Sequence, residues 1–281
     1  MIKKICIVGY GTITKNIIKN IANESDIFIN IWSRTHKFSE KQIECSDEIE
    51  KLIEDVDLIL SCVPDDKVSK HIWQHPIVID YIKRNHIYCM EMSTLSYEHI
   101  QSWHRLLKEI GGKPIECPFT KNRRINSDKS ISAFLFTEFY TDEIKDFINL
   151  FCNKIYSFSE QGEAIKFKLI YNTWGAEMLA QFSEMYGVVE RQIKSKDVAW
   201  NILCNDGWMS LVCQGILPKI QNKDDTVGFK LKYMKKDVDY SESMFEISEN
   251  LLYYATKKKF DDFVNDENMD KDFSLIVCMS T

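Results

Sequence analysis

A lysine and an asparagine four residues apart could carry out proton chemistry in this chain. Lys168 and Asn172 lie in the stretch Gly162–Glu190, which contains no proline and is long enough for about eight helical turns. Their spacing places both side chains on one face of a helix. An ammonium group beside a carbonyl oxygen can stabilise and protonate the negative charge that hydride transfer builds there. From these residues alone the pair is compatible with a general acid, Lys168, beside a neutral orienting group, Asn172, but a lysine without a chemical role is the more common case.

The expected helix around this pair is apolar on nearly every side, and such a helix is expected to be buried. An unpaired buried charge is expensive, so Lys168 needs a use or a route to water. Burial lowers the pKa of a lysine, which suits a proton donor. The alternative is that Lys168 extends its amine to solvent. Lys166, the rival lysine, projects from another side of the helix and has no asparagine partner.

Residues near the N-terminus predict a dinucleotide site. A β-branched run at residues 3–8 leads into Gly9–Thr14, a version of the G-x-G-x-x-G motif. The first glycine permits a tight turn, and the second lets the backbone approach a pyrophosphate at a helix N-terminus. An ordinary strand-to-helix turn is the alternative, and Thr14 replaces the third glycine. The position at the start of a βαβ unit favours the cofactor interpretation. The expected cofactor contacts are Gly9, Gly11, Thr12 and Ile13.

The end of the second expected strand, residues 27–32, favours NADP(H) over NAD(H). An enzyme that uses NAD usually has an acidic residue there, which accepts the ribose 2′-hydroxyl. This chain has Ser33, Arg34 and Thr35 instead. Arg34 can pair with a 2′-phosphate and stack on adenine, whereas an acid would repel the phosphate. A solvated arginine in a turn is the alternative.

The remaining pattern is that of an α/β protein. Further strands are expected at 57–62, 87–90, 114–117, 130–136 and 155–158, with helices at 12–22, 47–54, 65–73, 96–110 and 141–152. Strands alternating with helices imply a mostly parallel sheet covered on both faces. After residue 160 only helical patterns remain. We therefore predict a doubly wound dinucleotide-binding domain over residues 1–160 and an all-α domain over 161–281, joined by the long central helix.

Composition narrows the class of protein. The net charge of −6 argues against a general nucleic-acid binder. No run of 18 apolar residues is present, so no membrane span is expected, and the apolar part of the N-terminus is too short for a signal peptide. The nine cysteines include no C-x-x-C pair and fit buried free thiols in a reducing cytoplasm. We expect a cytoplasmic protein with neither nucleic acid nor membrane as a partner.

Five segments follow one another in the order and spacing of a known family. They are IVGYGTIT at 7–14, DLILSCVPD at 57–65, EMSTLSY at 91–97, the G-x-x-x-x-x-K-x-x-x-N segment at 162–172 and FKLKYMKKD at 229–237. Together they resemble the β-hydroxyacid dehydrogenase superfamily, which includes 3-hydroxyisobutyrate dehydrogenases, semialdehyde reductases, 6-phosphogluconate dehydrogenases and, more distantly, imine reductases. The resemblance covers almost the whole chain and implies a Rossmann domain, an all-α domain and an active site in the cleft between them.

The resemblance also implies roles for individual residues. The matched positions are Lys168 and Asn172 for the catalytic pair, Ser93 and Thr94 near the substrate carboxylate and nicotinamide ribose, Val63 and Pro64 beside the nicotinamide, and Lys236 and Asp237 for a pair that closes the site on substrate and cofactor. Thr14, in place of glycine, and Tyr97, in place of the family's proline, indicate a divergent member.

The largest departure follows the fifth expected strand. Family members commonly read A-P-V-S-G-G there, whereas this chain reads CPFTKN at 117–122, followed by two arginines. Losing both glycines argues against a simple small 3-hydroxyacid as substrate. Thr120, Lys121 and Asn122 occupy the expected substrate positions. The basic cluster Lys121–Arg124 could bind an anionic substrate, a phosphate or a carrier-protein arm, or it could be a solvated basic turn.

These observations predict an NADPH-dependent reductase acting on the C=O of a small acidic metabolite. Imine reduction is an alternative, but an imine-reducing site gains less from a cation beside an iminium. A catalytically silent dinucleotide-binding sensor or subunit is another. Oxidative decarboxylation of a sugar acid phosphate is disfavoured by the short second domain. His71 and His75 have zinc-compatible spacing without an evident third ligand, so no metal is expected.

The C-terminal half carries more large apolar residues than one small domain can easily bury. They include Trp200, Trp208, Met209, Leu251, Tyr253 and Tyr254. Exposed apolar area of this kind marks association surfaces. We predict a homodimer, or a higher homo-oligomer, formed through the helical domain.

Overall fold

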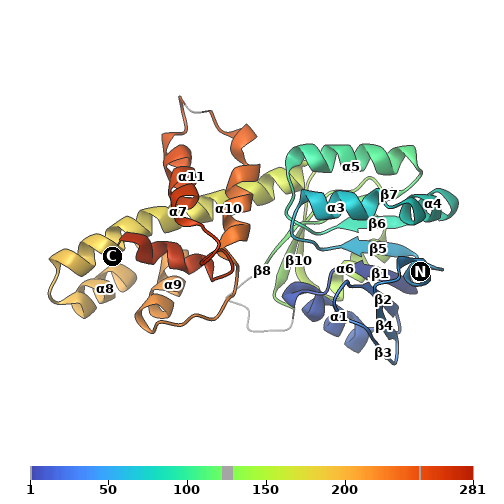
Figure 1. Cartoon of the computed structure of the whole chain (residues 1–281), viewed down its shortest axis with the longest axis horizontal. Coiled ribbons are helices and arrows are strands. Elements are labelled where there is room, and N and C mark those ends of the chain that lie inside the picture. Colours follow the sequence, from blue (N-terminus) through green and yellow to red (C-terminus); the bar gives the residue numbers. More distant parts are fainter. Residues whose placement is uncertain (1, 122–128, 247, 281) are drawn as a thin grey trace. The chain divides into compact units, whose positions relative to one another are not determined.

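The computed structural model describes residues 2–121, 129–246 and 248–280 (Figure 1). The chain divides into two compact units, Met1–Lys168 and Leu169–Thr281. The sequence predicted a boundary near residue 160, whereas the units divide eight residues later. The first turns of the central helix belong to the N-terminal unit because Ala164 packs against Phe134 and Phe136.

The N-terminal unit contains a seven-stranded sheet of order β3-β4-β2-β1-β5-β6-β7. Its strands are β1 (Lys4–Val8), β2 (Phe28–Trp32), β3 (Phe38–Glu40), β4 (Ile43–Ser46), β5 (Leu58–Ser61), β6 (Tyr88–Glu91) and β7 (Lys113–Glu116). All neighbours pair in parallel except β3, which runs antiparallel to β4 at the edge. Counted without β3, the parallel strands have the order 3-2-1-4-5-6 of a dinucleotide-binding fold. This confirms the predicted Rossmann domain.

Helices and a small second sheet complete this unit. The helices are α1 (Thr12–Glu24), α2 (Ile49–Leu52), α3 (Asp66–Trp73), α4 (Pro76–Asn85), α5 (Tyr97–Glu109) and α6 (Asp142–Asn149). The second sheet has the order β10-β9-β8, with strands β8 (Phe119–Lys121), β9 (Ile131–Leu135) and β10 (Cys152–Ser157). One hydrophobic core joins the central strands to Ile17 and Ile21 of α1 and Phe147 of α6.

Four elements were not predicted from the sequence. β3, β4 and β8 are three or four residues long and partly polar, so they lack a readable alternation of apolar residues. The turn between β3 and β4 contains Lys41 at a positive φ of 43°, without the glycine that usually marks such a turn. α4 begins at Pro76, a residue that is favourable in the first helical position although it breaks helix interiors.

The central helix α7 (Glu163–Gln192) is continuous, as predicted, but it is not buried on all sides. Its buried residues include Leu169, Leu179 and Phe182. Residues three or four apart on another face are exposed, and Trp174 is 64% exposed. The exposed apolar residues of α7 are Phe167, Ile170, Tyr171, Trp174, Met185 and Val188. The prediction of complete burial was therefore wrong, because an apolar face is buried only where another layer packs on it.

The regular elements described in the C-terminal unit are helices. After α7 it contains α8 (Lys196–Asn205), α9 (Leu211–Gln221), α10 (Leu231–Tyr240) and α11 (Leu251–Phe263), with short helical turns at Glu242–Met244 and Phe273–Ser280. Trp200 and Tyr253 are buried in its core, contrary to the sequence-based expectation of exposure. Trp200 stacks on Tyr186 of α7 at 5.2 Å between ring centroids. No helix in the described parts of the chain combines the length and apolarity needed to cross a bilayer.

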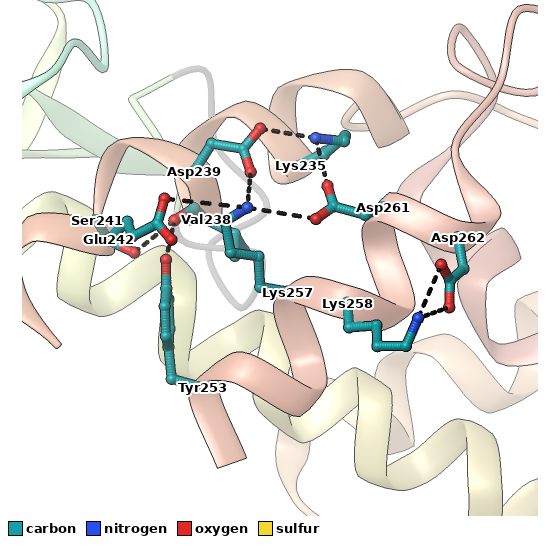
Figure 2. A network of polar contacts seen from close by, with 10 residues as sticks. All are labelled: Lys235, Val238, Asp239, Ser241, Glu242, Tyr253, Lys257, Lys258, Asp261 and Asp262. Atoms are coloured by element: carbon teal, nitrogen blue, oxygen red, sulfur yellow. Dashed lines mark hydrogen bonds and ion pairs between the residues drawn. The ribbon is translucent and has the colours of Figure 1, made fainter. Parts of the chain in front are cut away.

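Charged side chains join α10 to α11 (Figure 2). Lys235 Nζ lies 2.8 Å from Asp239 Oδ2 and 2.7 Å from Asp261 Oδ1. Lys257 Nζ lies 3.4 Å from Asp239 Oδ1 and 3.3 Å from Asp261 Oδ2. The Tyr253 hydroxyl donates to the Val238 carbonyl oxygen at 2.8 Å, and burial raises its pKa to about 12. These contacts hold in place α10, the helix that carries two predicted site residues.

Candidate functional site

The turn after β1 has the geometry of a dinucleotide loop. Gly9 has φ 99°, and a Cβ there would lie 2.6 Å from the Cys62 carbonyl oxygen. Only glycine meets both conditions without strain. A Cβ on Gly11 would meet no atom within 4 Å, so space is open before the N-terminus of α1. These two glycines have the properties that a pyrophosphate cradle requires.

Thr14 explains how the motif tolerates the loss of its third glycine. Its buried hydroxyl accepts from the Gly11 amide at 2.8 Å and donates to the Gly11 carbonyl at 3.1 Å. The first amides of α1, at Thr12 and Ile13, have no acceptor within the helix. They are the groups suited to an anion at this terminus.

The segment after β2 lies beside the glycine loop. The Ser33 amide donates to the Ser46 carbonyl at 2.9 Å, which continues the β2–β4 ladder by one residue. His36 Nδ1 lies 2.8 Å from Thr35 Oγ1, and the His36 ring packs edge-on against Tyr10 at 5.0 Å. Arg34 is exposed. Neither His36 nor Tyr10 was predicted as a site residue, because nothing in their spacing indicates that these rings meet.

The loops after β5 and β6 are joined by hydrogen bonds. The Val63 amide donates to Ser93 Oγ at 2.7 Å. The Ser96 amide and hydroxyl donate to Asp66 at 2.9 and 2.6 Å. Thr94 lies half-buried between these contacts, and Pro64 is exposed. Because β1 and β5 are neighbours where the strand order reverses, these loops and the glycine loop occupy the edge where such sheets bind ligands.

A buried carboxylate holds the start of α7. Glu116, at the end of β7, accepts from the Gly162 amide at 2.9 Å and the Ile165 amide at 2.6 Å. His104 Nε2 lies 3.2 Å from Glu116 Oε2. A carboxylate at this position satisfies otherwise unpaired amides and complements the helix dipole. Glu116 thereby ties the helix that carries Lys168 to the sheet, a role that its sequence position did not reveal.

Tyr97 packs against the same helix start. A Cβ on Gly162, which has φ 86°, would lie 2.5 Å from Tyr97 Cε2. Lys166 Nζ lies 4.1 Å from the centroid of the Tyr97 ring. The ring that replaces the family's proline therefore lies against Gly162, immediately before α7, and beneath Lys166 of α7. Lys166 is engaged there and projects from a different face than Lys168.

Lys168 and Asn172 are both buried, at 8% and 9% exposure, and lie one turn apart on α7. Asn172 Nδ2 donates to Asp237 Oδ2 at 2.6 Å. Lys236 Nζ lies 3.0 Å from Asp237 Oδ1. The C-terminal unit thus brings together three residues that the resemblance predicted: Asn172, Lys236 and Asp237.

Other predicted positions are less informative. Thr120 is half-buried and Lys121 exposed on β8, where Thr120 pairs in register with Ser132. Asn122, with the two arginines that follow it, lies outside the described residues. The His71 and His75 rings lie 6.2 Å apart. Among the residues that the structure describes, no group of three His, Cys, Asp or Glu side chains could hold a metal ion.

Sequence comparison identifies the N-terminal part. Residues 4–125 match the profile of the NAD binding domain of 6-phosphogluconate dehydrogenase. The cytokine-like nuclear factor N-PAC of Xenopus tropicalis is 23% identical over 248 residues, covering 84% of this chain and 45% of that protein. N-PAC of Danio rerio is 23% identical over 249 residues, covering 86% and 54%. The chain spans about half the length of the curated relatives it matches.

Solved structures share the fold over the full length. A 3-hydroxyisobutyrate dehydrogenase of Mycobacterium tuberculosis superposes with a TM-score of 0.81 at 14% identity, covering 99% of both chains. Psf3 in complex with NADP+ and 2-OPP gives 0.82 at 14% identity, covering 99% and 100%. An imine reductase from Myxococcus stipitatus in complex with NADP+ gives 0.58 at 13% identity, covering 99% and 100%. Residues 4–125 are therefore similar to the NAD binding domain of 6-phosphogluconate dehydrogenase, and the whole chain shares the fold of a 3-hydroxyisobutyrate dehydrogenase and an imine reductase, in agreement with the fold that the resemblance implied.

Proposed function

We propose that this protein is an NADPH-dependent oxidoreductase that reduces the C=O of a small acidic metabolite. The observation that carries the proposal is Lys168: a lysine only 8% exposed, one turn before a buried asparagine, on a helix anchored to a dinucleotide-binding unit. A buried lysine side chain places an amine where a substrate oxygen shielded from water could meet it. An amine in that position suits a proton donor.

The roles of the residues follow from hydride chemistry. When bound, NADPH supplies a hydride to the carbonyl carbon. Lys168 stabilises the negative charge on the carbonyl oxygen and gives that oxygen a proton. Asn172 adds a hydrogen-bonding group without adding charge. Ser93 and Lys236 supply a hydroxyl donor and a cation, which suit a substrate carboxylate.

The preference for NADPH rests on the segment after β2. Ser33, Arg34 and Thr35 replace the acidic residue that would accept a free ribose 2′-hydroxyl. Arg34 is exposed, and His36 of the same segment packs against Tyr10 of the glycine loop. Arg34→Ala should weaken NADPH binding by about 1–3 kcal/mol and leave NADH binding nearly unchanged. Arg105→Ala, at an exposed arginine of α5, is the matched control. Equal losses for both cofactors would show that Arg34 does not contact the phosphate.

Activity is tested by NADPH consumption with glyoxylate, succinic semialdehyde, tartronate semialdehyde and, in a separate arm, the cyclic imine 1-pyrroline. Oxidation of NADPH with a carbonyl acid supports the proposal. Oxidation with the imine alone supports the imine reductase alternative. Oxidation with neither would count against a reductase of either kind.

A second candidate is a dinucleotide-binding protein without turnover. Its support is that the curated relatives in the comparison are called nuclear factors rather than enzymes. It predicts micromolar or tighter NADPH binding with no oxidation across the panel. The presence of Ser93, Lys168, Asn172 and Lys236 favours the enzyme.

We also propose that two copies of the chain associate through the helical unit. Trp174 and Met185 on α7, together with Trp208, Leu211 and Leu251, expose large apolar side chains. Burying these side chains against a second copy would remove apolar surface from water and so stabilise the dimer. Light scattering at micromolar concentration should give at least twice the chain mass. A strictly monomeric species would contradict this.

A cytoplasmic location is part of the same proposal. All nine cysteines are free thiols, and most are buried. Burial raises the pKa of Cys6 to about 12, which keeps that thiol unreactive. Free thiols of this kind suit a reducing compartment. Fractionation of a tagged chain with nuclear, organellar and cytosolic markers is the test.

A further inference from the structure

The loop after β6 is held by a buried carboxylate, that of Glu91, which begins the segment EMSTLSY and was given no role from the sequence. Glu91, the last residue of β6, is 1% exposed. Its Oε1 accepts from the Ser93 amide at 3.0 Å. Its Oε2 accepts from Ser69 Oγ and from Trp73 Nε1, both at 2.8 Å and both from α3. Three donors from two segments therefore converge on one carboxylate.

The contact with Ser93 extends to the next loop. Ser93 Oγ accepts from the Val63 amide at 2.7 Å. A hydroxyl that accepts a hydrogen bond keeps its own O–H for another acceptor. The same arrangement thus joins the Val63 segment to Ser93 and leaves the Ser93 proton available to a ligand. A second tie, from Ser96 to Asp66, runs between the same two loops.

Sheet stability alone does not account for Glu91. A buried carboxylate pays a desolvation cost that an apolar residue at the end of a buried strand would avoid. Its donors are a hydroxyl, an indole N–H and a backbone amide, none of which carries a charge. What the carboxylate adds is a pair of acceptors, one for the Ser93 backbone and one for α3. Its chemistry therefore fits the placement of Ser93.

We propose that Glu91 is a positioning residue for the nicotinamide half of the site. It holds the Ser93 backbone against α3, and Ser93 in turn holds the Val63 amide, so the two loops keep one geometry. This inference rests on the proposed function and on the resemblance, which implies that Val63 lies beside the nicotinamide and Ser93 near the substrate carboxylate and the nicotinamide ribose.

The test is Glu91→Gln, which keeps the side-chain volume. A glutamine has one oxygen, so whichever way the amide is turned, an NH2 group faces either the Ser93 amide or the Ser69 and Trp73 donors. Affinities are measured by calorimetry for NADPH and for 2′,5′-ADP, which has the adenosine and 2′-phosphate but no nicotinamide. We expect NADPH to bind about tenfold more weakly, as for one lost hydrogen bond, with 2′,5′-ADP unchanged. Glu98→Gln, at an exposed glutamate of α5, is the control and should change neither affinity.

Amide hydrogen exchange gives a readout that needs no ligand. Glu91→Gln should speed exchange at Ser93 and Val63 and leave the β1 amides as slow as in the wild type. Should Glu91→Gln fail to fold, Ser69→Ala removes one donor to the same carboxylate and should shift exchange at Ser93 in the same direction. Equal weakening of NADPH and 2′,5′-ADP, or unchanged exchange at Ser93 and Val63, would overturn the proposal. A wild type that binds neither ligand would instead contradict the proposed function, and exchange would still decide the role of Glu91.

Discussion

Asn172 Nδ2 donates a 2.6 Å hydrogen bond to Asp237 Oδ2, and both side chains are almost completely buried. The bond joins α7 to α10 within the C-terminal unit. Asn172 was predicted to orient Lys168 or the substrate, and Asp237 to contact the cofactor. In the structure the Asp237 carboxylate contacts both Asn172 and Lys236, so these three side chains position one another. A change at Asn172 or Asp237 should therefore affect the other.

Asn172→Ala should lower the free energy of unfolding by about 1–3 kcal/mol, because the buried Asp237 carboxylate loses its amide donor. Urea unfolding measures the difference. Asn201→Ala removes an amide that bonds to Asn205 on an exposed helix face, and it should change the free energy by less than about 0.5 kcal/mol. An Asn172→Ala variant as stable as the wild type would show that the bond contributes nothing net.

The two glycines of the β1–α1 loop should respond differently to alanine. Gly9→Ala forces a Cβ to within 2.6 Å of a backbone oxygen at a positive φ, so we expect a loss of folding stability of about 1–3 kcal/mol. Gly11→Ala meets no protein atom and should fold normally, yet its Cβ would occupy the space expected for the pyrophosphate. Thermal unfolding and NADPH titration of both variants test this. Normal NADPH affinity in Gly11→Ala would show that the pyrophosphate does not bind at this loop.

The network between α10 and α11 predicts a pH-dependent contribution to stability. Partial burial opposes ionisation of Asp261, but hydrogen bonds from Lys235 and Lys257 outweigh it and hold the pKa of Asp261 below its usual value. A carboxyl with a lowered pKa in the folded state stabilises the fold above its unfolded pKa of about 3.9 and loses that contribution as the pH falls through the lower folded pKa.

Asp261→Asn should therefore lower the free energy of unfolding by about 0.5–1 kcal/mol at pH 7, a value that includes a reduction for solvent screening. Below about pH 4 the difference from the wild type should become progressively smaller. Urea unfolding across pH 2.5–8 is the measurement. Asp262→Asn is the control, because Asp262 pairs only with the exposed Lys258 among the contacts shown in Figure 2. A cost of Asp261→Asn that stays constant down to pH 2.5 would contradict the assignment.

The order of strands and helices in the N-terminal unit was largely predictable, because buried parallel strands appear in the sequence as short, mostly apolar runs. DLILSC at 57–62 and KKICIV at 3–8 are of this kind. The same rule fails for β3, at the edge of the sheet, and for its neighbour β4, because most positions in both strands are exposed or only partly buried and so tolerate polar residues. α7 was readable as a helix, but its exposed face was not. The sequence shows which faces of a helix are apolar, but it does not show which of those faces is covered by another layer of the fold.

Contacts between distant residues were beyond the sequence. Glu116 lies 46 residues before Gly162, and Glu91 lies 22 residues after Ser69. Each acid looks like an ordinary strand end until the fold brings donors to it. Lys168, Asn172 and Asp237 were identified through the family's spacing, and their chemistry supported that match. Trp200 and Tyr253 were predicted to be exposed but are buried, because an aromatic residue fits a core and an interface equally well.

The central claim is that Lys168 gives the proton to the reduced oxygen. The most direct measurement is the turnover number of Lys168→Met and Lys166→Met with NADPH and the best carbonyl acid of the panel. We predict that Lys168→Met folds, binds NADPH normally and turns over about 10²–10⁴-fold more slowly, the usual contribution of a positioned acid. Lys166→Met should stay near the wild-type rate, because that amine lies over the Tyr97 ring. A Lys168→Met enzyme with near-normal turnover would contradict the claim.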